Sequence, residues 1–209
     1  MKDKMYLYPK WIRAWHITNA LMFLILIVTG LSMQYTDKEN PSYMVGFAMA
    51  VKWHNFTALI LTASYIIFVL GNAFAGNGKY YRMKKENFVS DLMKQMKYYA
   101  FGMFRGEKHP FPVTLERKFN PLQKFSYVLA MYVGMPLIII SGVVLLFPEV
   151  AIDSFFGMSG LVLNDVLHIV TGFFLSIFMI IHIYTCTLGA KPSSLFRGMI
   201  TGFHESEDH

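Results

Sequence analysis

The sequence predicts an all-α integral membrane protein, a bundle of four spanning helices with an amphipathic helix in the longest loop. The first observation is composition: 55% of the 209 residues are hydrophobic, only 15% are charged, and the mean hydropathy is +0.40. The hydrophobic fraction is higher, and the charged fraction lower, than in typical soluble domains. The second is that four segments reach the roughly 20 apolar residues that a bilayer span needs. The third is that most Lys and Arg residues lie before the first span, in residues 76–124 and in the tail, which four spans place on the same side of the membrane. We expect residues 1–209 to form a single membrane domain.

The four predicted spans cover residues 15–36, 51–75, 125–147 and 161–188. Before the apolar run of the first span lie Trp11 and Trp15, which are typical of an interfacial aromatic belt. The third span contains Pro136, which a spanning helix tolerates when its neighbours satisfy the carbonyl group that the proline leaves unbonded. The fourth span is apolar apart from a few polar residues, which include His168 and His182.

Residues 76–124 form the longest polar stretch of the chain. Within it, Phe88, Leu92, Met96 and Tyr99 recur at helical spacing with charged residues between them. This pattern predicts an amphipathic helix that lies on the membrane surface.

The distribution of positive charge predicts the orientation. Four Lys or Arg residues precede the first span, eleven lie in residues 76–124 and two in the tail, against two at residues 37–52. Cytoplasmic loops carry the excess of positive charge, so both termini and the long loop are expected in the cytoplasm. We therefore predict a multi-pass protein of the bacterial inner membrane with lipid as its surroundings. A chain this hydrophobic is not expected to bind nucleic acid, and its N-terminus does not resemble a removable signal peptide.

The single cysteine, Cys186, limits the cofactors that the chain can hold. One thiol excludes an internal disulfide framework, an iron–sulfur cluster held by this chain alone, and covalent haem attachment through C-x-x-C-H. Any haem must therefore be held by non-covalent ligation.

Four of the seven histidines lie in the predicted spans, and the topology sorts them into two pairs. His16 and His182 lie near the cytoplasmic ends of the first and fourth spans, whereas His54 and His168 lie near the outer ends of the second and fourth. His168 and His182 are fourteen residues apart, which puts them on one helix face and ~21 Å apart along the axis. Each pair joins two helices, as the axial imidazoles of a b-type haem do. We therefore predict two haem b groups with these four histidines as iron ligands.

Single histidines in spanning helices also have roles other than haem ligation. A single histidine near a helix end is often an interfacial anchor or a hydrogen-bonding partner of a neighbouring helix. A zinc or copper site would call for more ligands, or for carboxylate or thiolate groups, at the same depth. The matched depths of the two pairs favour haem. Gly30, Gly142 and Gly172 could make room for flat macrocycles or for close helix packing. The remaining histidines, His109, His204 and His209, are expected to be solvated.

Several short motifs carry a family resemblance. They are RAWHITNA at Arg13–Ala20, the histidine that opens the second span, NPLQK at Asn120–Lys124, and the fourteen-residue spacing of His168 and His182. Together they resemble the cytochrome b subunits of membrane-bound formate dehydrogenases, nickel–iron hydrogenases and thiosulfate reductases, and the opening YLYPKWIRAWH is most similar to the last of these. The resemblance covers nearly the whole chain.

The resemblance implies a four-helix, di-haem electron-transfer subunit. Such a subunit exchanges electrons between an iron–sulfur or multihaem partner on the outer, periplasmic side and a membrane quinone, menaquinone or ubiquinone. It has no catalytic residue of its own, because substrate chemistry belongs to another subunit.

The resemblance also implies a quinone site made by Asn120, Leu122 and His182. Leu122 stands where the formate dehydrogenase pattern has glycine. Without the resemblance, the sequence slightly favours another role for Asn120, as the cap of the third span or the start of a turn before Pro121.

Two alternatives from other classes remain open at this stage. One is a self-sufficient transmembrane cytochrome b reductase, and the other is a membrane anchor or small transporter without haem. The identity of the partner and the direction of electron flow do not follow from the sequence.

Overall fold

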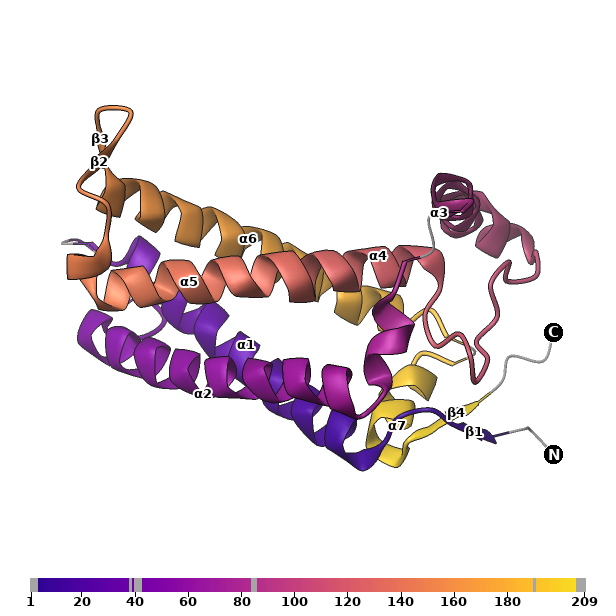
Figure 1. Cartoon of the computed structure of the whole chain (residues 1–209). Coiled ribbons are helices and arrows are strands. Elements are labelled where there is room, and N and C mark those ends of the chain that lie inside the picture. Colours follow the sequence, from indigo (N-terminus) through magenta and orange to yellow (C-terminus); the bar gives the residue numbers. More distant parts are fainter. Residues whose placement is uncertain (1–3, 38, 40–42, 84–85, 190, 206–209) are drawn as a thin grey trace. The chain divides into compact units, whose positions relative to one another are not determined.

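The computed structural model describes residues 4–37, 39, 43–83, 86–189 and 191–205, and it is mainly helical (Figure 1). Four helices are long and apolar enough to cross a membrane: Lys10–Tyr35 (α1), Phe47–Phe74 (α2), Pro121–Leu146 and Gly160–Cys186 (α6). The third of these consists of α4 (Pro121–Leu129), a π-helical turn (η4, Ala130–Gly134) and α5 (Met135–Leu146). This confirms the all-α class and the four spans.

Three of the spans begin four or five residues before the predicted start, and the third shows why. The Asn120 side chain accepts a hydrogen bond from the Gln123 backbone N–H, and the Gln123 side chain accepts one from the Asn120 N–H. This capping box, with Pro121 at the first helical position, starts the helix before the apolar run begins. The apolar pattern that set the prediction marks only the buried or lipid-facing part of each helix.

The long loop contains the expected amphipathic helix, α3 (Phe88–Lys97), with Asp91 in its first turn and Lys94 and Lys97 in its last. It continues into a π-helical turn (η2, Tyr98–Gly102) and a 3-10 turn (η3, Met103–Arg105). Val89, Met93 and Met96 are exposed on it. Shorter elements are the 3-10 turns η1 (Asn77–Tyr81) and η5 (Pro148–Val150), and helix α7 (Ser194–Thr201).

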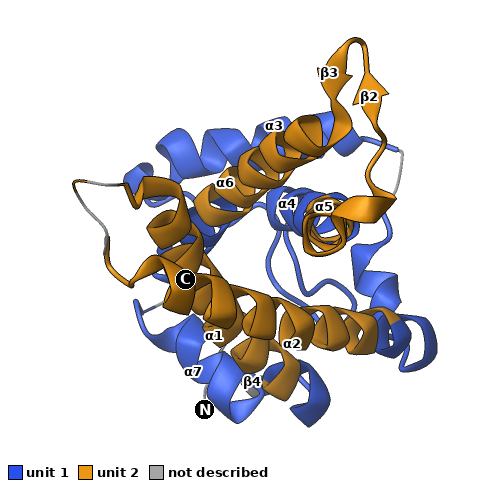
Figure 2. Ribbon diagram, turned by 90° about the vertical axis from the view of Figure 1, so that its left-hand side faces the viewer, with its two compact units in different colours: residues 1–13, 70–133, 178–209 blue, residues 14–69, 134–177 orange. Residues whose placement is uncertain are grey.

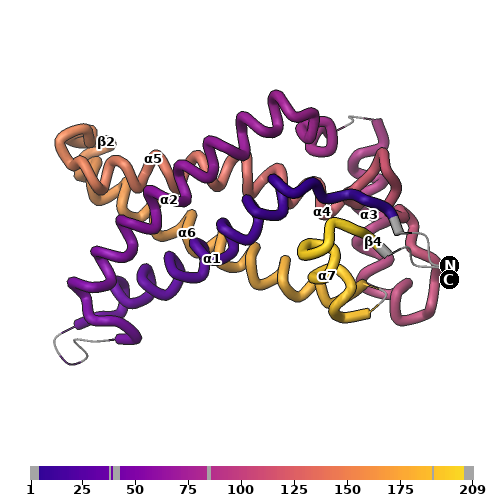
Figure 3. The backbone as a smooth tube through the Cα atoms, turned by 90° about the horizontal axis from the view of Figure 1, so that it is seen from below, coloured from indigo at the N-terminus to yellow at the C-terminus, as the bar shows by residue number. Residues whose placement is uncertain are grey.

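Two small antiparallel sheets complete the described structure. Strand β1 (Lys4–Tyr6) pairs with β4 (Phe203–Glu205), so that Met5 lies opposite His204. Strands β1 and β4 lie side by side near α7 (Figure 3). The second sheet is the hairpin of β2 (Ser154–Phe155) and β3 (Met158–Ser159) between α5 and α6.

The chain divides into two compact units (Figure 2). Unit 2 contains Ala14–Val69 and Gly134–Ile177, a bundle of four helical segments. Unit 1 contains Met1–Arg13, Leu70–Val133 and Phe178–His209, with the remaining helix ends, α3, α4, α7 and the β1–β4 sheet. The expectation of a single domain over residues 1–209 stays a prediction.

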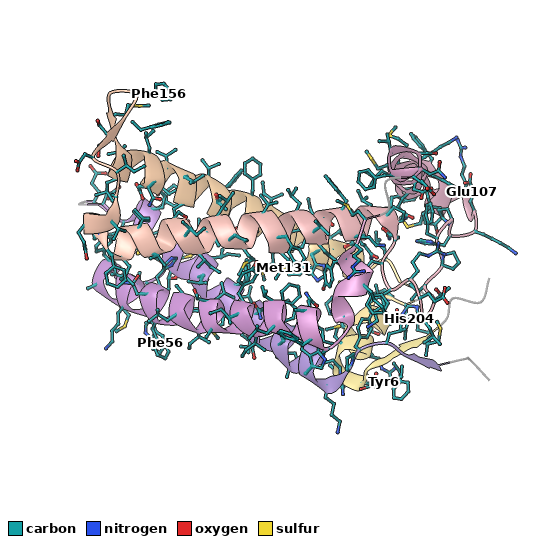
Figure 4. The ribbon with its side chains drawn as sticks, viewed as in Figure 1. Tyr6, Phe56, Glu107, Met131, Phe156 and His204 are labelled. Carbon is teal, nitrogen blue, oxygen red and sulfur yellow. The ribbon has the colours of Figure 1, made fainter. Side chains whose placement is uncertain are left out.

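Large apolar side chains cover the outward surface of the spans. In unit 2, Phe56 points away from the helix bundle (Figure 4), and it is exposed together with Leu59 and Phe174. An exposed apolar surface of this kind suits a lipid surrounding and not water. The described part of the chain therefore has the outer surface of a membrane protein.

The expectation of a solvated His204 is wrong. This residue, labelled in Figure 4, lies in β4 and is 8% exposed. The pairing of β4 with β1 buries it, and such a pairing between distant ends of a chain leaves no local pattern in the sequence. His209, for which the same was expected, lies outside the described residues.

Candidate functional site

Two of the predicted haem ligands lie together in unit 2. His54 on α2 and His168 on α6 have ring centroids 6.3 Å apart, with an angle of 65° between the ring planes. Two imidazoles that bind one metal ion from opposite sides, at about 2 Å per metal–nitrogen bond, have centroids roughly 6 Å apart. The separation of the two rings therefore suits an iron atom between them.

The His54 ring is held by a hydroxyl group of α1. Thr29 Oγ1 lies 2.9 Å from His54 Nδ1 and 2.8 Å from the carbonyl oxygen of Ile25, one turn earlier. A hydroxyl has one proton, and here the proton goes to the carbonyl. The contact with Nδ1 is then a hydrogen bond only if Nδ1–H donates, which leaves Nε2 of His54 with its lone pair available to a metal.

The His168 ring is held in the same way by α5. Ser141 Oγ donates to the carbonyl oxygen of Leu137 at 2.7 Å and lies 2.9 Å from His168 Nδ1. In addition, the Asn164 amide donates to the Ser141 carbonyl oxygen at 2.9 Å and joins α6 to α5. Histidines that bind metals usually donate their other ring N–H to such an acceptor, which fixes both the tautomer and the ring orientation.

Two glycines next to these hydroxyl residues face the histidine rings. A Cβ atom on Gly142 would lie 3.2 Å from Cε1 of His168, which is tighter than ordinary packing, and one on Gly30 would lie 3.6 Å from Cε1 of His54. A larger side chain at Gly142 would push the imidazole away from Ser141. A Cβ on Gly172 would meet only Ile138, at 3.7 Å. Gly142 thus makes room for the His168 ring, whereas a Cβ on Gly30 would make only an ordinary contact with His54.

The ligand set fits haem better than an ion bound by protein alone. Within the described parts of the chain, no three His, Cys, Asp or Glu side chains come together as metal ligands. A site with two imidazoles suits a metal whose other ligands belong to a macrocycle. The zinc or copper interpretation would need further ligands of the kinds that this site lacks.

The other two predicted ligands, His16 and His182, belong to different units. His182 lies in unit 1, where the Tyr127 hydroxyl is 3.3 Å from Nδ1 and Phe178 stacks on the ring at 5.9 Å. Cys186 Sγ lies 3.9 Å from Nε2 of the same ring. His16 lies in unit 2 and is half-buried. The pairing of His16 with His182 stays a prediction.

Asn120, the predicted quinone-binding residue, is 4% exposed and serves as the cap of α4. Its amide also donates to the Tyr99 hydroxyl at 2.9 Å, which leaves the second amide hydrogen for another acceptor. Leu122 is half-buried in the first turn of α4. Asn120 therefore caps α4, as its residue type allowed. The quinone-binding role of Asn120 and Leu122 stays a prediction.

Gln95 on α3 is a polar residue that the sequence analysis missed. It is fully buried, and neither its amide nitrogen nor its amide oxygen has a hydrogen-bond partner among the described residues. A buried amide without partners costs about 1–3 kcal/mol. Its only sequence signal is the spacing: it lies one helical turn before Tyr99, the partner of Asn120.

Thr29 and Ser141 were also missed, although a weak signal exists. Each is a hydroxyl residue followed by glycine inside an apolar span. The same pair occurs at Thr171 and Gly172, where that glycine faces Ile138 instead of a histidine. The motif alone therefore does not identify the residues that hold a ligand.

Comparisons with known proteins give one family and one relative. The family model described as prokaryotic cytochrome b561 matches residues 7–202. The chain is 38% identical over 206 residues to the Escherichia coli (strain K12) protein YdhU, which is named only provisionally as a cytochrome. That alignment covers 97% of this chain and 75% of the relative. No solved structure matches.

Proposed function

Because the chain belongs to the prokaryotic cytochrome b561 family, we propose that it is a di-haem b subunit that passes electrons between a redox partner and the membrane quinone pool. Membership itself assigns haem b binding and electron transfer in a bacterial membrane. It also disfavours a membrane anchor or transporter without haem. The proposal adds the number of haems, their ligands, the quinone and the partner.

The pair of His54 and His168 is the observation that carries the proposal. Haem b supplies a reversible one-electron couple when it is bound. The chain supplies two imidazoles at a suitable distance, each held by a hydroxyl whose proton is already donated to its own helix. Such fixed rings favour rapid electron transfer because they do not have to reorient when the charge on the iron changes.

The second haem of the proposal lies between His16 and His182. It rests on the sequence, namely the fourteen-residue spacing of His168 and His182 and the matching depths of His16 and His182. The Tyr127 hydroxyl near Nδ1 of His182 is compatible with a ligand role, because it gives this ring a polar partner as well.

The proposed quinone site includes Asn120, Leu122 and His182, with menaquinone or ubiquinone as the substrate. Gln95 is a further candidate, because its buried amide has both a donor and an acceptor without partners. A quinone carbonyl can accept a hydrogen bond from such an amide, and the hydroxyl of a quinol can donate one. The hydrogen bond between Tyr99 and Asn120 links this turn of the loop helix to the start of α4.

The proposed location is the inner membrane, with both termini and the long loop in the cytoplasm, and the charge distribution supports this orientation. The proposed partner is an iron–sulfur or multihaem subunit on the periplasmic side, near the end that carries His54 and His168. The arrangement serves either direction of electron flow. Copurification with such a subunit would distinguish this function from that of a self-sufficient reductase.

Haem content tests the central claim. We expect a pyridine haemochrome assay on the purified chain to find two haem b groups per chain, and His168→Ala to retain one of them. The control is His109→Ala, which removes an imidazole outside the four spans and is expected to retain both. A single haem in the unaltered protein would refute the di-haem assignment, and two haems in His168→Ala would refute the ligand.

A further inference from the structure

Unit 1 contains a cavity of about 350 Å³ that the electron-transfer function does not use. Its apolar wall includes Leu7, Trp11 and Ala75, and two lysines, Lys79 and Lys118, contribute the charged groups. The volume is near the lower end of the range for small-molecule sites, roughly 300–1,000 Å³.

Lys118 is an unusual lining residue because it is buried. It is 9% exposed, and its ammonium nitrogen lies 4.1 Å from the centre of the Tyr80 ring. The ammonium nitrogen of Lys79 lies 5.0 Å from the centre of the same ring. Two cations therefore share one aromatic ring at the cavity.

The charge of this pair is not balanced within the described structure. Across the described residues no carboxylate forms an ion pair with either lysine, and the electrostatic neighbour of Lys118 is Lys79. Burial and the nearby Lys79 ammonium lower the pKa of Lys118 to about 8. A buried charge is costly unless it is paired, and a cation–π contact offsets only part of that cost. An anion in the cavity would supply the missing partner.

The position of the cavity indicates where such an anion would come from. Trp11 lies in the first turn of α1, and Ala75 directly follows the end of α2. The ends of spanning helices lie at the depth of lipid headgroups, where basic residues attract anionic lipids. The apolar wall beside the lysines suits a ligand that has both an anionic and an apolar part.

We propose that this cavity is a binding site for a phosphate group, held by the ammonium groups of Lys118 and Lys79. The phosphate can belong to an anionic phospholipid or be free inorganic phosphate, and the apolar wall favours the phospholipid. The inference does not depend on the number of haems or on the quinone site.

The test uses the full chain with its haem, stripped of lipid in a non-ionic detergent. Native mass spectrometry would follow titrations with short-chain phosphatidylglycerol, with zwitterionic phosphatidylcholine and with inorganic phosphate. We expect phosphatidylglycerol to bind about tenfold more tightly than phosphatidylcholine, and Lys118→Gln to remove about tenfold of that affinity. The matched control, Lys108→Gln, makes the same charge change at an exposed lysine of the same loop and is expected to bind as the unaltered protein does.

The outcomes distinguish a phospholipid from free inorganic phosphate as the ligand, and both from failure of the proposal. If millimolar inorganic phosphate binds and displaces the lipid, the site takes free phosphate. If it does not displace the lipid, the site takes the phospholipid. If neither ligand binds, or if Lys118→Gln and Lys108→Gln behave alike, the proposal is wrong.

Two further variants keep the test decisive if Lys118→Gln does not fold. Lys118→Arg keeps the charge and should retain most of the affinity. Lys79→Gln changes an exposed residue and should weaken phosphatidylglycerol binding while the haem content stays unchanged. Unaltered affinity in Lys79→Gln would overturn the two-lysine site.

Discussion

The candidate sites of the two units differ in how their polar groups are bonded. In unit 2, His54 and His168 each contact a hydroxyl that donates to its own helix, and each keeps Nε2 available. In unit 1, the Gln95 amide has no partner among the described residues, and the Lys118 ammonium lies over the Tyr80 ring. His182 in unit 1 contacts a phenol at 3.3 Å, which is a longer contact than either hydroxyl makes in unit 2.

The difference teaches what kind of ligand each unit suits. A resident cofactor needs ligands that are oriented before it binds, and the hydrogen bonds to Thr29 and Ser141 provide that orientation. A ligand that enters and leaves needs protein groups that find their partner only when it is present. Gln95, the further candidate for the quinone site, and Lys118, on which the phosphate proposal rests, have this property.

The largest expected effect is that of removing one of these hydroxyl groups. Ser141→Ala removes the hydroxyl that contacts Nδ1 of His168, and loss of such a partner typically costs 10–100-fold in metal affinity (about 1.4–2.7 kcal/mol). We expect faster loss of one haem on dilution in detergent, measured by the decrease in Soret absorbance. Ser176→Ala is the control, since the Ser176 hydroxyl donates to the Gly172 carbonyl oxygen of its own helix. Equal haem retention in Ser141→Ala and Ser176→Ala would show that Ser141 does not orient the His168 ring.

The next effect concerns the unpartnered amide of unit 1. Gln95→Leu replaces a buried polar group with an apolar one of similar size, so the quinone-free protein should gain about 1 kcal/mol in free energy of unfolding. If Gln95 binds the quinone, the rate of quinone turnover should fall several-fold at the same time. Gln34→Leu, at an exposed position of α1, should change neither quantity much. A stabilised variant with unaltered turnover would make Gln95 a purely structural residue.

The sequence was sufficient to predict the spans, because length and hydropathy determine them almost alone. The family resemblance drawn from RAWHITNA and NPLQK is confirmed by the family model and by the relative in E. coli. The helix starts were less accurate, because Asn120 and Pro121 start the third span through a hydrogen-bonded cap instead of through apolar periodicity.

Contacts between distant parts of the chain could not be predicted. Thr29 and Ser141 are ordinary residues of apolar spans until the fold brings His54 and His168 next to them. The burial of Gln95 and Lys118 has the same origin, since both lie among charged residues that indicate a solvated loop. The proximity of His54 and His168 could be predicted because the depth of each follows from the topology, but the hydroxyl groups that contact them could not.

A smaller effect is expected at His182. Tyr127→Phe removes the hydroxyl near Nδ1, but Phe178 still stacks on the ring. We expect both haems to be retained and one midpoint potential to change less than in Ser141→Ala. The control is Tyr132→Phe, which removes a phenol of the same span that accepts a hydrogen bond from the Asn72 amide. If Tyr127→Phe lost haem more readily than Ser141→Ala, the contrast between the two units would be reversed.

The smallest effect is the pH dependence of phosphate binding in unit 1. Burial and Lys79 lower the pKa of Lys118 to about 8, so this ammonium loses its proton as the pH rises through that value. A bound anion favours the charged form and raises the pKa of Lys118, so by linkage binding must weaken between pH 7 and pH 9, by about fivefold. Tyr6, Tyr80 and Lys79 also line the cavity, so Lys118→Gln is needed to isolate the contribution of Lys118. Phosphatidylglycerol titrations at the two pH values should show the dependence in the unaltered protein and not in Lys118→Gln, and an equal dependence in both would assign it to another group.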